Sequence, residues 1–258
     1  MSVQLSNAGV VITGAGGGIG AALARRFAAD GARLVLADLD EGVRDVAAEL
    51  GAHAVVGDAA GEAGVADLIA RSRSVLGEID VYCANAGVAP IGGADSPEDV
   101  WASTWDVNVM AHVRAARALL PAWLARGRGH FLATVSAAGL LTTLGSAPYS
   151  VTKHGALAFA EWLLVTYKHR GISVQALCPQ GVRTRMLDSV GPAGALMLAS
   201  ALTPEFVADV VTDALAGDQF LILPHPEVAQ YYATRAADNE HWIAGMNKLQ
   251  RKLEAAGT

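Results

Sequence analysis

Short apolar runs rich in β-branched residues alternate along this chain with longer segments of helical periodicity. The runs are Val10–Ile12, Leu34–Leu36, Ala54–Val56, Ile79–Tyr82, His130–Val135, Ile172–Leu177 and Phe220–Leu223. Short runs of this kind are typical of strands buried on both faces, and helices between them supply the crossovers of βαβ units. The alternation therefore predicts a three-layer, doubly wound α/β fold with a seven-stranded parallel sheet.

The segments between the strands carry the helix signals. They predict helices at 18–30, 41–50, 62–76, 97–126, 149–169, 204–216 and 227–255. Gly31, Gly51, Gly77 and Gly171 each follow such a segment, where a left-handed C-terminal cap belongs. The sequence shows no internal repeat, low-complexity tract or linker, so we expect a single domain over 1–258, with 226–258 as a C-terminal helical extension.

Composition excludes several classes of protein. Of the 258 residues 52% are hydrophobic and 17% are charged, which excludes a disordered chain. The net charge is −6, and no basic cluster longer than a pair precedes the last turn of the chain. We therefore expect no nucleic-acid partner and no anionic membrane surface.

The uncharged N-terminal run and the cysteines bear on location. Residues 1–24 lack a basic region and contain several glycines and polar residues, so we expect neither a signal segment nor a membrane span. Cys83 and Cys178 are too few for a disulfide framework, which fits a reducing cytoplasm. The seven histidines show no His-x-x-x-His pattern, so no metal is expected.

A glycine-rich turn, Thr13-Gly14-Ala15-Gly16-Gly17-Gly18-Ile19-Gly20, joins the first strand to the first helix. Such a turn lets the backbone approach a pyrophosphate, whose charge faces the free N–H groups of the helix. The alternative is a merely flexible turn, and the surplus of glycines leaves open which of Gly14, Gly16, Gly18 and Gly20 has which role. No Lys-Ser/Thr pair follows, which excludes a P-loop.

Acidic residues follow the second and third strands. Asp38 is placed to accept hydrogen bonds from adenosine ribose hydroxyls and to repel a 2′-phosphate, which favours NAD over NADP. A helix cap is the other role open to it, but Asp40 is better placed for one. Asp58, with Ala59, is a candidate for bonding the adenine amine or for an acid at a helix start.

After the fourth strand, Asn85-Ala86-Gly87 offers small residues where a cofactor would lie against the backbone. Taken alone, this segment is only a turn. Its place beside the glycine-rich turn makes all three residues candidates for cofactor binding.

Tyr149 and Lys153 are four positions apart, which places the phenol and the ammonium on one helix face. Lowering a tyrosine pKa from about 10 to 7–8 needs about 3–4 kcal/mol of phenolate stabilisation. The lysine cation and a nicotinamide charge are candidate sources. Ser136, at the end of the fifth strand, is placed to bond the same substrate oxygen. Separately, these residues fit a surface helix pair and a turn equally well.

Taken in order, these motifs resemble one family. The set is Thr13-Gly14-x-x-x-Gly18-Ile19-Gly20, Asp58, Asn85-Ala86-Gly87, Asn108, Ser136 and Tyr149-x-x-x-Lys153. It closely resembles the classical short-chain dehydrogenase/reductase family over residues 5–225, which implies a Rossmann fold and hydride transfer between an alcohol carbon and a nicotinamide.

The resemblance implies four catalytic roles. It makes Tyr149 the general acid/base and Ser136 the hydroxyl that positions the substrate. Lys153 would hold the nicotinamide ribose and lower the tyrosine pKa, and Asn108 would anchor a water in the proton relay.

One segment departs from the family pattern. The chain reads Cys178-Pro179-Gln180-Gly181-Val182-Arg183-Thr184, with Gln180 at the usual glycine position. The resemblance implies cofactor contacts from Pro179, Val182 and Thr184. We expect Gln180 to face the substrate pocket.

The resemblance also implies a substrate lid at 185–204. The chain is uncharged over 189–204, with Leu196, Met197 and Leu198 near glycine hinges, although an ordinary buried helix fits as well. Met186 and Leu140 are expected substrate contacts, and Leu140, Leu141 and Thr142 are expected to line the other wall. Together these residues favour a lipophilic secondary alcohol or ketone.

The C-terminal segment carries an apolar stripe at helical spacing: Trp242, Met246, Leu249 and Leu253. It predicts a helix that packs either on its own core or on a neighbouring subunit. The family's assemblies imply a homotetramer or homodimer.

The sequence thus predicts an NAD-dependent dehydrogenase of lipophilic secondary alcohols, acting also as a ketone reductase. An NADPH-preferring carbonyl reductase and a catalytically idle dinucleotide-binding scaffold protein remain as alternatives.

Overall fold

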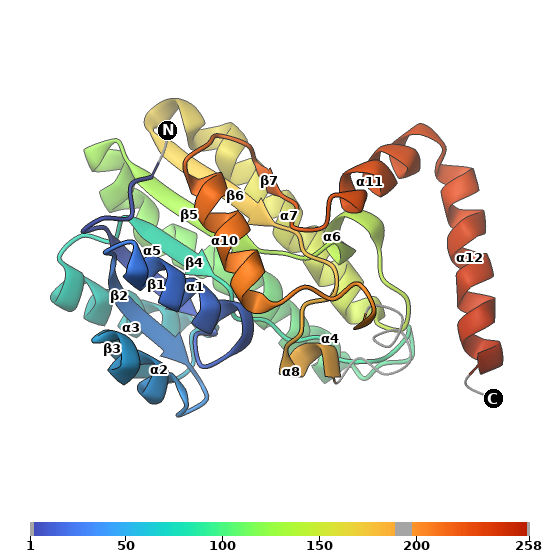
Figure 1. The fold of residues 1–258 in the computed structure, drawn as a ribbon, viewed down its shortest axis with the longest axis horizontal. Coiled ribbons are helices and arrows are strands. Elements are labelled where there is room, and N and C mark those ends of the chain that lie inside the picture. The colour runs from blue at the N-terminus through green and yellow to red at the C-terminus, as the bar shows by residue number, and fades with distance from the viewer. Residues whose placement is uncertain (1–2, 189–197, 257–258) are drawn as a thin grey trace.

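The structure, a computed structural model, describes residues 3–188 and 198–256. Within them one sheet of seven parallel strands runs in the order β3-β2-β1-β4-β5-β6-β7 (Figure 1). The strands are β1 (Gly9–Thr13), β2 (Arg33–Asp38), β3 (His53–Val56), β4 (Val81–Ala84), β5 (Gly129–Thr134), β6 (Ile172–Leu177) and β7 (Leu221–Ile222). The predicted doubly wound α/β fold is confirmed, and the strand order reverses direction between β1 and β4, where such folds bind ligands.

Helices cover both faces of this sheet. The described residues form the helices α1 (Gly18–Ala29), α2 (Val43–Leu50), α3 (Glu62–Leu76), α4 (Glu98–Trp105), α5 (Ala111–Arg126), α6 (Ala138–Leu141), α7 (Ala147–Tyr167), α8 (Arg185–Asp188), α10 (Pro204–Leu215), α11 (Glu227–Ala237) and α12 (Asn239–Ala256), of which α11 and α12 lie beyond the sheet edge. A π-helical turn, Asp106–Met110, joins α4 to α5, and a 3₁₀ turn, Lys168–Arg170, ends α7.

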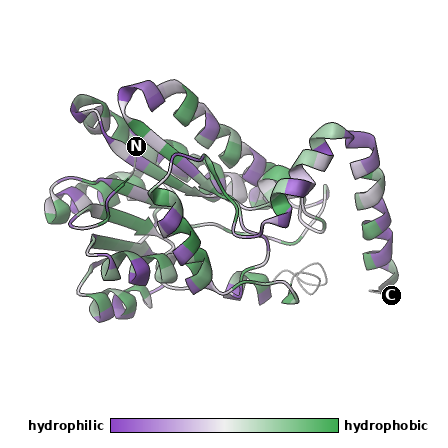
Figure 2. Ribbon diagram, turned by 45° about the horizontal axis from the view of Figure 1, so that its top comes forward, coloured by the Kyte–Doolittle hydropathy of each residue, from purple (hydrophilic) through white to green (hydrophobic). Residues whose placement is uncertain are grey.

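Two apolar cores lie on opposite faces of the sheet because successive strand residues point in opposite directions. Val10 and Ile12 of β1 pack in the core under α1, α2 and α10. Val11, between them, packs in the core under α3, α5 and α7. Figure 2 shows the hydrophobic strands at the centre, with hydrophilic residues on the outer turns of the helices.

Two of the predicted helices are divided. The segment predicted as one helix at 97–126 is interrupted by the π-helical turn that contains Asn108. The segment predicted at 227–255 breaks at Asp238, whose non-helical backbone ends α11. The short helices α6 and α8 were not predicted, since four residues carry no detectable period.

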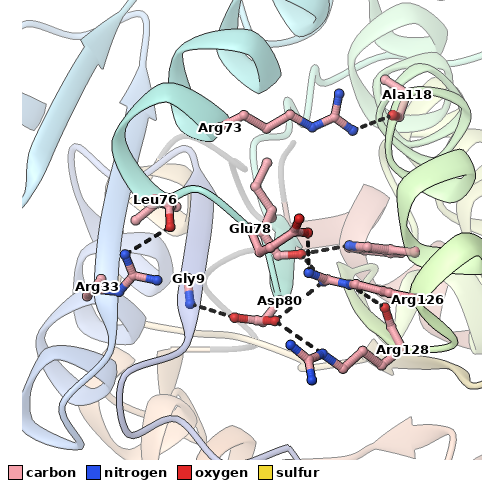
Figure 3. Close-up of polar contacts among 11 residues, drawn as sticks. Gly9, Arg33, Arg73, Leu76, Glu78, Asp80, Ala118, Arg126 and Arg128 are labelled. Atoms are coloured by element: carbon pink, nitrogen blue, oxygen red, sulfur yellow. Dashed lines mark hydrogen bonds and ion pairs between the residues drawn. The ribbon is translucent and has the colours of Figure 1, made fainter.

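The strand predicted at Ile79–Tyr82 begins instead at Val81. Side chains bind backbone groups next to this start and next to the start of β1 (Figure 3). The Asp80 carboxylate accepts the Gly9 N–H at 2.9 Å and lies 3.4 Å from the Arg126 guanidinium. The Ile79 carbonyl accepts the indole N–H of Trp123 at 2.7 Å. This cluster fixes the starts of β1 and β4, at the end of the sheet opposite the glycine-rich turn.

The predicted lid is only partly within the described residues. Its first turn is α8, its last residues lead into α10, and 189–197, including Leu196 and Met197, lie outside the described part. No helix among the described residues is both long enough and apolar enough to cross a membrane.

The Asp80 cluster gives a stability prediction. Replacing Asp80 with Ala should lower the free energy of unfolding by about 1–3 kcal/mol, because the buried Gly9 N–H loses its acceptor. Urea unfolding followed by circular dichroism measures this change. Asp67→Ala, which removes only an exposed ion pair with Arg71, is the control and should leave the midpoint nearly unchanged. Equal midpoints for the two variants would contradict the role given to Asp80.

Candidate active site

A cavity of about 570 Å³ opens at the carboxyl ends of the strands. Its lining residues come from the glycine-rich turn, from the ends of β2, β4 and β5, from α7, and from the loop after β6. Parallel α/β sheets bind ligands at this edge.

The backbone separates the roles of the glycines. Gly14 and Gly18 have φ of +66° and +52°, a region that favours glycine. A Cβ on Gly14 would lie 2.9 Å from the Ala86 Cα, and one on Gly20 would lie 2.1 Å from the Gly14 carbonyl oxygen. Gly20 is therefore required for close packing of α1 on the turn, while the turn itself lies open to the cavity at Gly14 and Gly18.

Thr13 and Asn85 tie this turn to β4. The Thr13 hydroxyl accepts the backbone N–H groups of Asn85 and Ala86, each at 3.0 Å, and donates to the Cys83 carbonyl at 3.2 Å. The Asn85 amide donates to the Thr13 carbonyl at 3.0 Å and accepts from the Thr134 hydroxyl at 3.0 Å. Asn85 therefore shapes the cofactor edge of the cavity with its side chain as well as lining it.

Both oxygens of the Asp38 carboxylate are hydrogen-bonded. One accepts the Gly16 N–H at 2.8 Å and the other accepts the Asp40 N–H at 3.0 Å. Asp38 also lines the cavity, so its negative charge faces the space beside the glycine-rich turn. Gly16 itself contributes to the site by holding this carboxylate.

Asp40 lies in the turn before α2 but does not cap this helix, whose N-cap residue is Gly42 and which has no side-chain cap. Its carboxylate accepts the Gly42 N–H at 2.8 Å and pairs with Arg185 at 3.2 Å. The bond from Gly42, and then Arg185, hold the pKa of Asp40 below its ordinary value. Arg185 thereby lies on the cofactor side of the cavity, at 3.4 Å from the Cβ position of Gly17, and not at the substrate end.

Asp58 is an acid at the start of a helix, which is one of the two roles that the sequence left open. Its carboxylate accepts the N–H groups of Ala60 at 2.7 Å and Gly61 at 3.0 Å, just before α3. Asp58 and Ala59 nevertheless line the cavity.

The structure brings Ser136, Tyr149 and Lys153 to one side of the cavity. The start of α7 is capped by Ser146, which fixes the first turn that carries Tyr149. The Lys153 ammonium donates to the Thr134 carbonyl at 2.9 Å and lies 5.6 Å from the centre of the Tyr149 ring. The Ser136 hydroxyl accepts the Ala138 N–H at 3.1 Å, which fixes its position at the start of α6.

Burial governs the electrostatics of these groups. Burial raises the pKa of Tyr149 above its ordinary value, and the hydrogen bond with Ser136 opposes that rise. Burial lowers the pKa of Lys153 to about 8. The described side chains alone therefore do not give the lowered tyrosine pKa that the sequence led us to expect.

Asn108 lies just outside the cavity wall, in the π-helical turn. Its amide accepts the Val88 N–H at 3.0 Å and donates to the Val88 carbonyl at 2.9 Å and to the Thr152 hydroxyl at 3.1 Å. Asn108 thus joins the loop after β4 to α7, one residue before Lys153. A π-turn at this position is typical of a functional site.

Pro179, Gln180, Val182 and Thr184 line the cavity together with Met186. The N–H of Gln180 donates to Nδ1 of His225 at 3.2 Å. His225 is buried between two prolines after β7, and burial lowers its pKa. This hydrogen bond between Gln180 and His225 was not predicted from the sequence. The Pro-His-Pro segment directly after the last strand was the available signal.

Leu140 was expected to contact the substrate, but it does not line the cavity. Its side chain is 1% exposed and packs in the core. Leu141 and Thr142, which were predicted together with it, do line the cavity.

Three cavity residues come from the C-terminal extension: Tyr231 of α11, and Trp242 and Met246 of α12. No role at the site was predicted for them, although the apolar stripe on 242–253 was the signal for two of the three.

Comparisons with known proteins agree with this geometry. Residues 8–194 match the family model of the short chain dehydrogenases. The 1-deoxy-11-beta-hydroxypentalenate dehydrogenase of Streptomyces exfoliatus is 37% identical over 236 residues, which are 87% of this chain and 86% of that protein.

Two solved structures are similar over most of their length. A short chain dehydrogenase/reductase from Burkholderia phymatum in complex with NAD has a TM-score of 0.84 at 29% identity, covering 92% of this chain and 96% of that one. A protein from Beutenbergia cavernae with bound NADP has a TM-score of 0.77 at 28% identity, covering 88% and 100%. The chain belongs to the short-chain dehydrogenase/reductase family, whose members are NAD(P)-dependent oxidoreductases.

The buried lysine gives a prediction with a defined pH dependence. Below pH 8 the native state holds a charged Lys153 in a desolvated place, so Lys153→Met should raise the free energy of unfolding at pH 7 by about 1–3 kcal/mol. Between pH 8 and 10.5 the unfolded chain binds more protons at this residue than the native chain does, so the wild type gains stability as the pH rises. The difference in free energy of unfolding between Lys153→Met and the wild type therefore becomes smaller.

Urea unfolding of both proteins at pH 7 and pH 10 measures this difference. Lys168→Met, at the exposed end of α7, is the control and should show no such narrowing. A variant that is less stable than wild type at pH 7 would contradict the cost assigned to Lys153.

Proposed function

We propose that this chain is an NAD-dependent dehydrogenase of lipophilic secondary alcohols, which also reduces the matching ketones. The observation that carries the proposal is the grouping of Ser136, Tyr149 and Lys153 on one side of a cavity that also contains the glycine-rich turn. The relative from Streptomyces exfoliatus supports an alcohol substrate, since it is named as the dehydrogenase of a hydroxy compound.

Ser136, Tyr149 and Lys153 have different roles in the proposed reaction. Ser136 and Tyr149 would bond the substrate oxygen, and the phenol oxygen of Tyr149 would take the proton from an alcohol or return it to a ketone. Lys153, held by the Thr134 carbonyl, keeps an ammonium beside the phenol. A bound nicotinamide would accept or supply the hydride.

The residues present fit a dinucleotide. Gly14 and Gly18 open the turn to the cavity, and the N-terminus of α1 presents free N–H groups there. Asp38 would receive the ribose hydroxyls and disfavour a 2′-phosphate. An NADPH preference is the second candidate, supported by Arg185 beside Gly17 and by the NADP-bound protein from Beutenbergia cavernae.

We also propose that the chain acts as a homodimer or homotetramer. The support is an exposed apolar surface on α7, where Trp162 is 53% and Val165 is 76% exposed. Trp162 stacks on Phe159, with ring centroids 6.3 Å apart, which adds an aromatic pair to this surface.

Tyr149→Phe tests the mechanism. The variant loses the proton-transferring oxygen, so turnover of a secondary alcohol should fall by about 10²–10⁴-fold. Its affinity for NAD, measured by calorimetry, should change little. Tyr167→Phe, at the far end of the same helix, should retain wild-type turnover. Unchanged turnover in Tyr149→Phe would refute the assignment.

Replacing Asp38 tests the proposed preference for NAD over NADP. In the double variant Asp38→Ala/Leu39→Arg, the ratio of kcat/KM for NADP to that for NAD should rise at least about tenfold, because a repelling charge becomes an attracting one. Leu39→Arg alone is the matched control, and its ratio should rise less. If the wild type already prefers NADP, the second candidate holds and the proposal fails.

A further inference from the structure

The C-terminal helices reach the cavity from outside the sheet. In Figure 1, α11 and α12 leave the sheet edge beyond β7 and lie on the side of α6 and α7. Tyr231, Trp242 and Met246 line the same cavity as Ser136 and Tyr149. For this C-terminal segment, the sequence left open whether it packs on its own core or on a neighbouring subunit.

Arg235 fixes α11 to the elements that carry the site. Its guanidinium donates to the Leu140 carbonyl of α6 and contacts Nε2 of His154 at 3.2 Å. His154 follows Lys153 on α7, and its Nδ1 is 2.9 Å from the Ser150 carbonyl. The position of α11 is therefore set directly by the catalytic segment.

Asp238 then fixes the first turn of α12. Its N–H donates to the Thr234 carbonyl at 3.0 Å, which closes α11, and its carboxylate accepts the His241 N–H at 2.9 Å. Its carbonyl accepts the Trp242 N–H at 3.1 Å. The Tyr231 and Trp242 rings lie 6.3 Å apart. Trp242 is thus held from both helices.

The two faces of α12 differ at this turn. Trp242 and Met246, four positions apart, face the cavity. Ile243, the residue after Trp242, is 54% exposed and does not line the cavity. The chain therefore offers a matched control on the same helical turn.

The chemistry of this wall is apolar. Among the described residues, those lining the cavity from α6, α11 and α12 carry no charge; they are Ala138, Leu141, Tyr231, Trp242 and Met246. Aromatic and thioether side chains bind flat or irregular apolar groups well, and such a wall offers no ion-pair partner to a charged one.

We propose that Trp242 and Met246 determine substrate specificity by contacting a bulky, ring-containing apolar group attached to the reacting carbon. This inference rests on the proposed function. In this proposal, α12 contacts the substrate bound in its own subunit and does not pack on a second copy of the chain.

The test compares Trp242→Ala, Trp242→Phe and Ile243→Ala with a graded series of alcohols: 2-propanol, cyclohexanol and 2-decalol, each with saturating NAD. Trp242→Ala should raise KM for 2-decalol at least about tenfold, because a large aromatic contact is lost. The loss of kcat/KM in this variant should grow along the series and be smallest for 2-propanol, which has no ring to contact residue 242. Trp242→Phe should recover most of the loss, and Ile243→Ala should match wild type.

Calorimetric titration with 2-decalone in the presence of NAD, where the ketone has no hydride donor and no turnover occurs, separates the two hypotheses. Weaker ketone binding in Trp242→Ala alone supports the inference, even if the wild type oxidises no alcohol of the series and the proposed function fails. Equal ketone affinity in Trp242→Ala and Ile243→Ala overturns the inference. So does a change of oligomeric state in Trp242→Ala, on size-exclusion chromatography with light scattering, at unchanged ketone affinity. Met246→Ala repeats the test if Trp242→Ala does not fold.

Discussion

The hydrogen bonds that lock Thr13 to the end of β4 determine the rest of the site. One hydroxyl accepts two backbone N–H groups and donates to a third backbone group, using its full capacity. The Asn85 amide closes the same link and extends it to β5 through Thr134. Because Thr134 also receives Lys153 through its carbonyl, the cofactor edge and the catalytic helix share a single rigid support.

That support carries a cost in stability. A lysine at 3% exposure among apolar neighbours loses hydration that a single carbonyl replaces only in part, and its lowered pKa reflects this. Such a residue is explained by its place beside the Tyr149 ring and not by any benefit to the fold. The opposite end of the sheet, where Asp80 and Arg126 bind backbone groups, supplies stability without contact with the site.

Much of this molecule was predictable because its signals are local. The alternating strands, the glycine-rich turn and the Tyr149/Lys153 spacing depend on neighbours in sequence, and the fold followed from them. Asn85 shows what is not local: its partners Thr13 and Thr134 lie 72 and 49 residues away, so the sequence showed only a turn. Leu140 and Leu141 differ by a rotation within one helical turn, which no periodicity over four residues specifies. The break at Asp238 follows from its own capping bonds, which replace helical ones.

The joint at Asp238 has a mechanical consequence. Helix α12 has 18 residues and is about 27 Å long, and near its start the backbone N–H groups of His241 and Trp242 donate to Asp238. A rotation about this joint would therefore move the far end of α12 farther than it would move Trp242. Because Trp242 lies close to the joint, a displacement of the distal half, around Leu249 and Leu253, would reach the cavity wall only as a much smaller displacement.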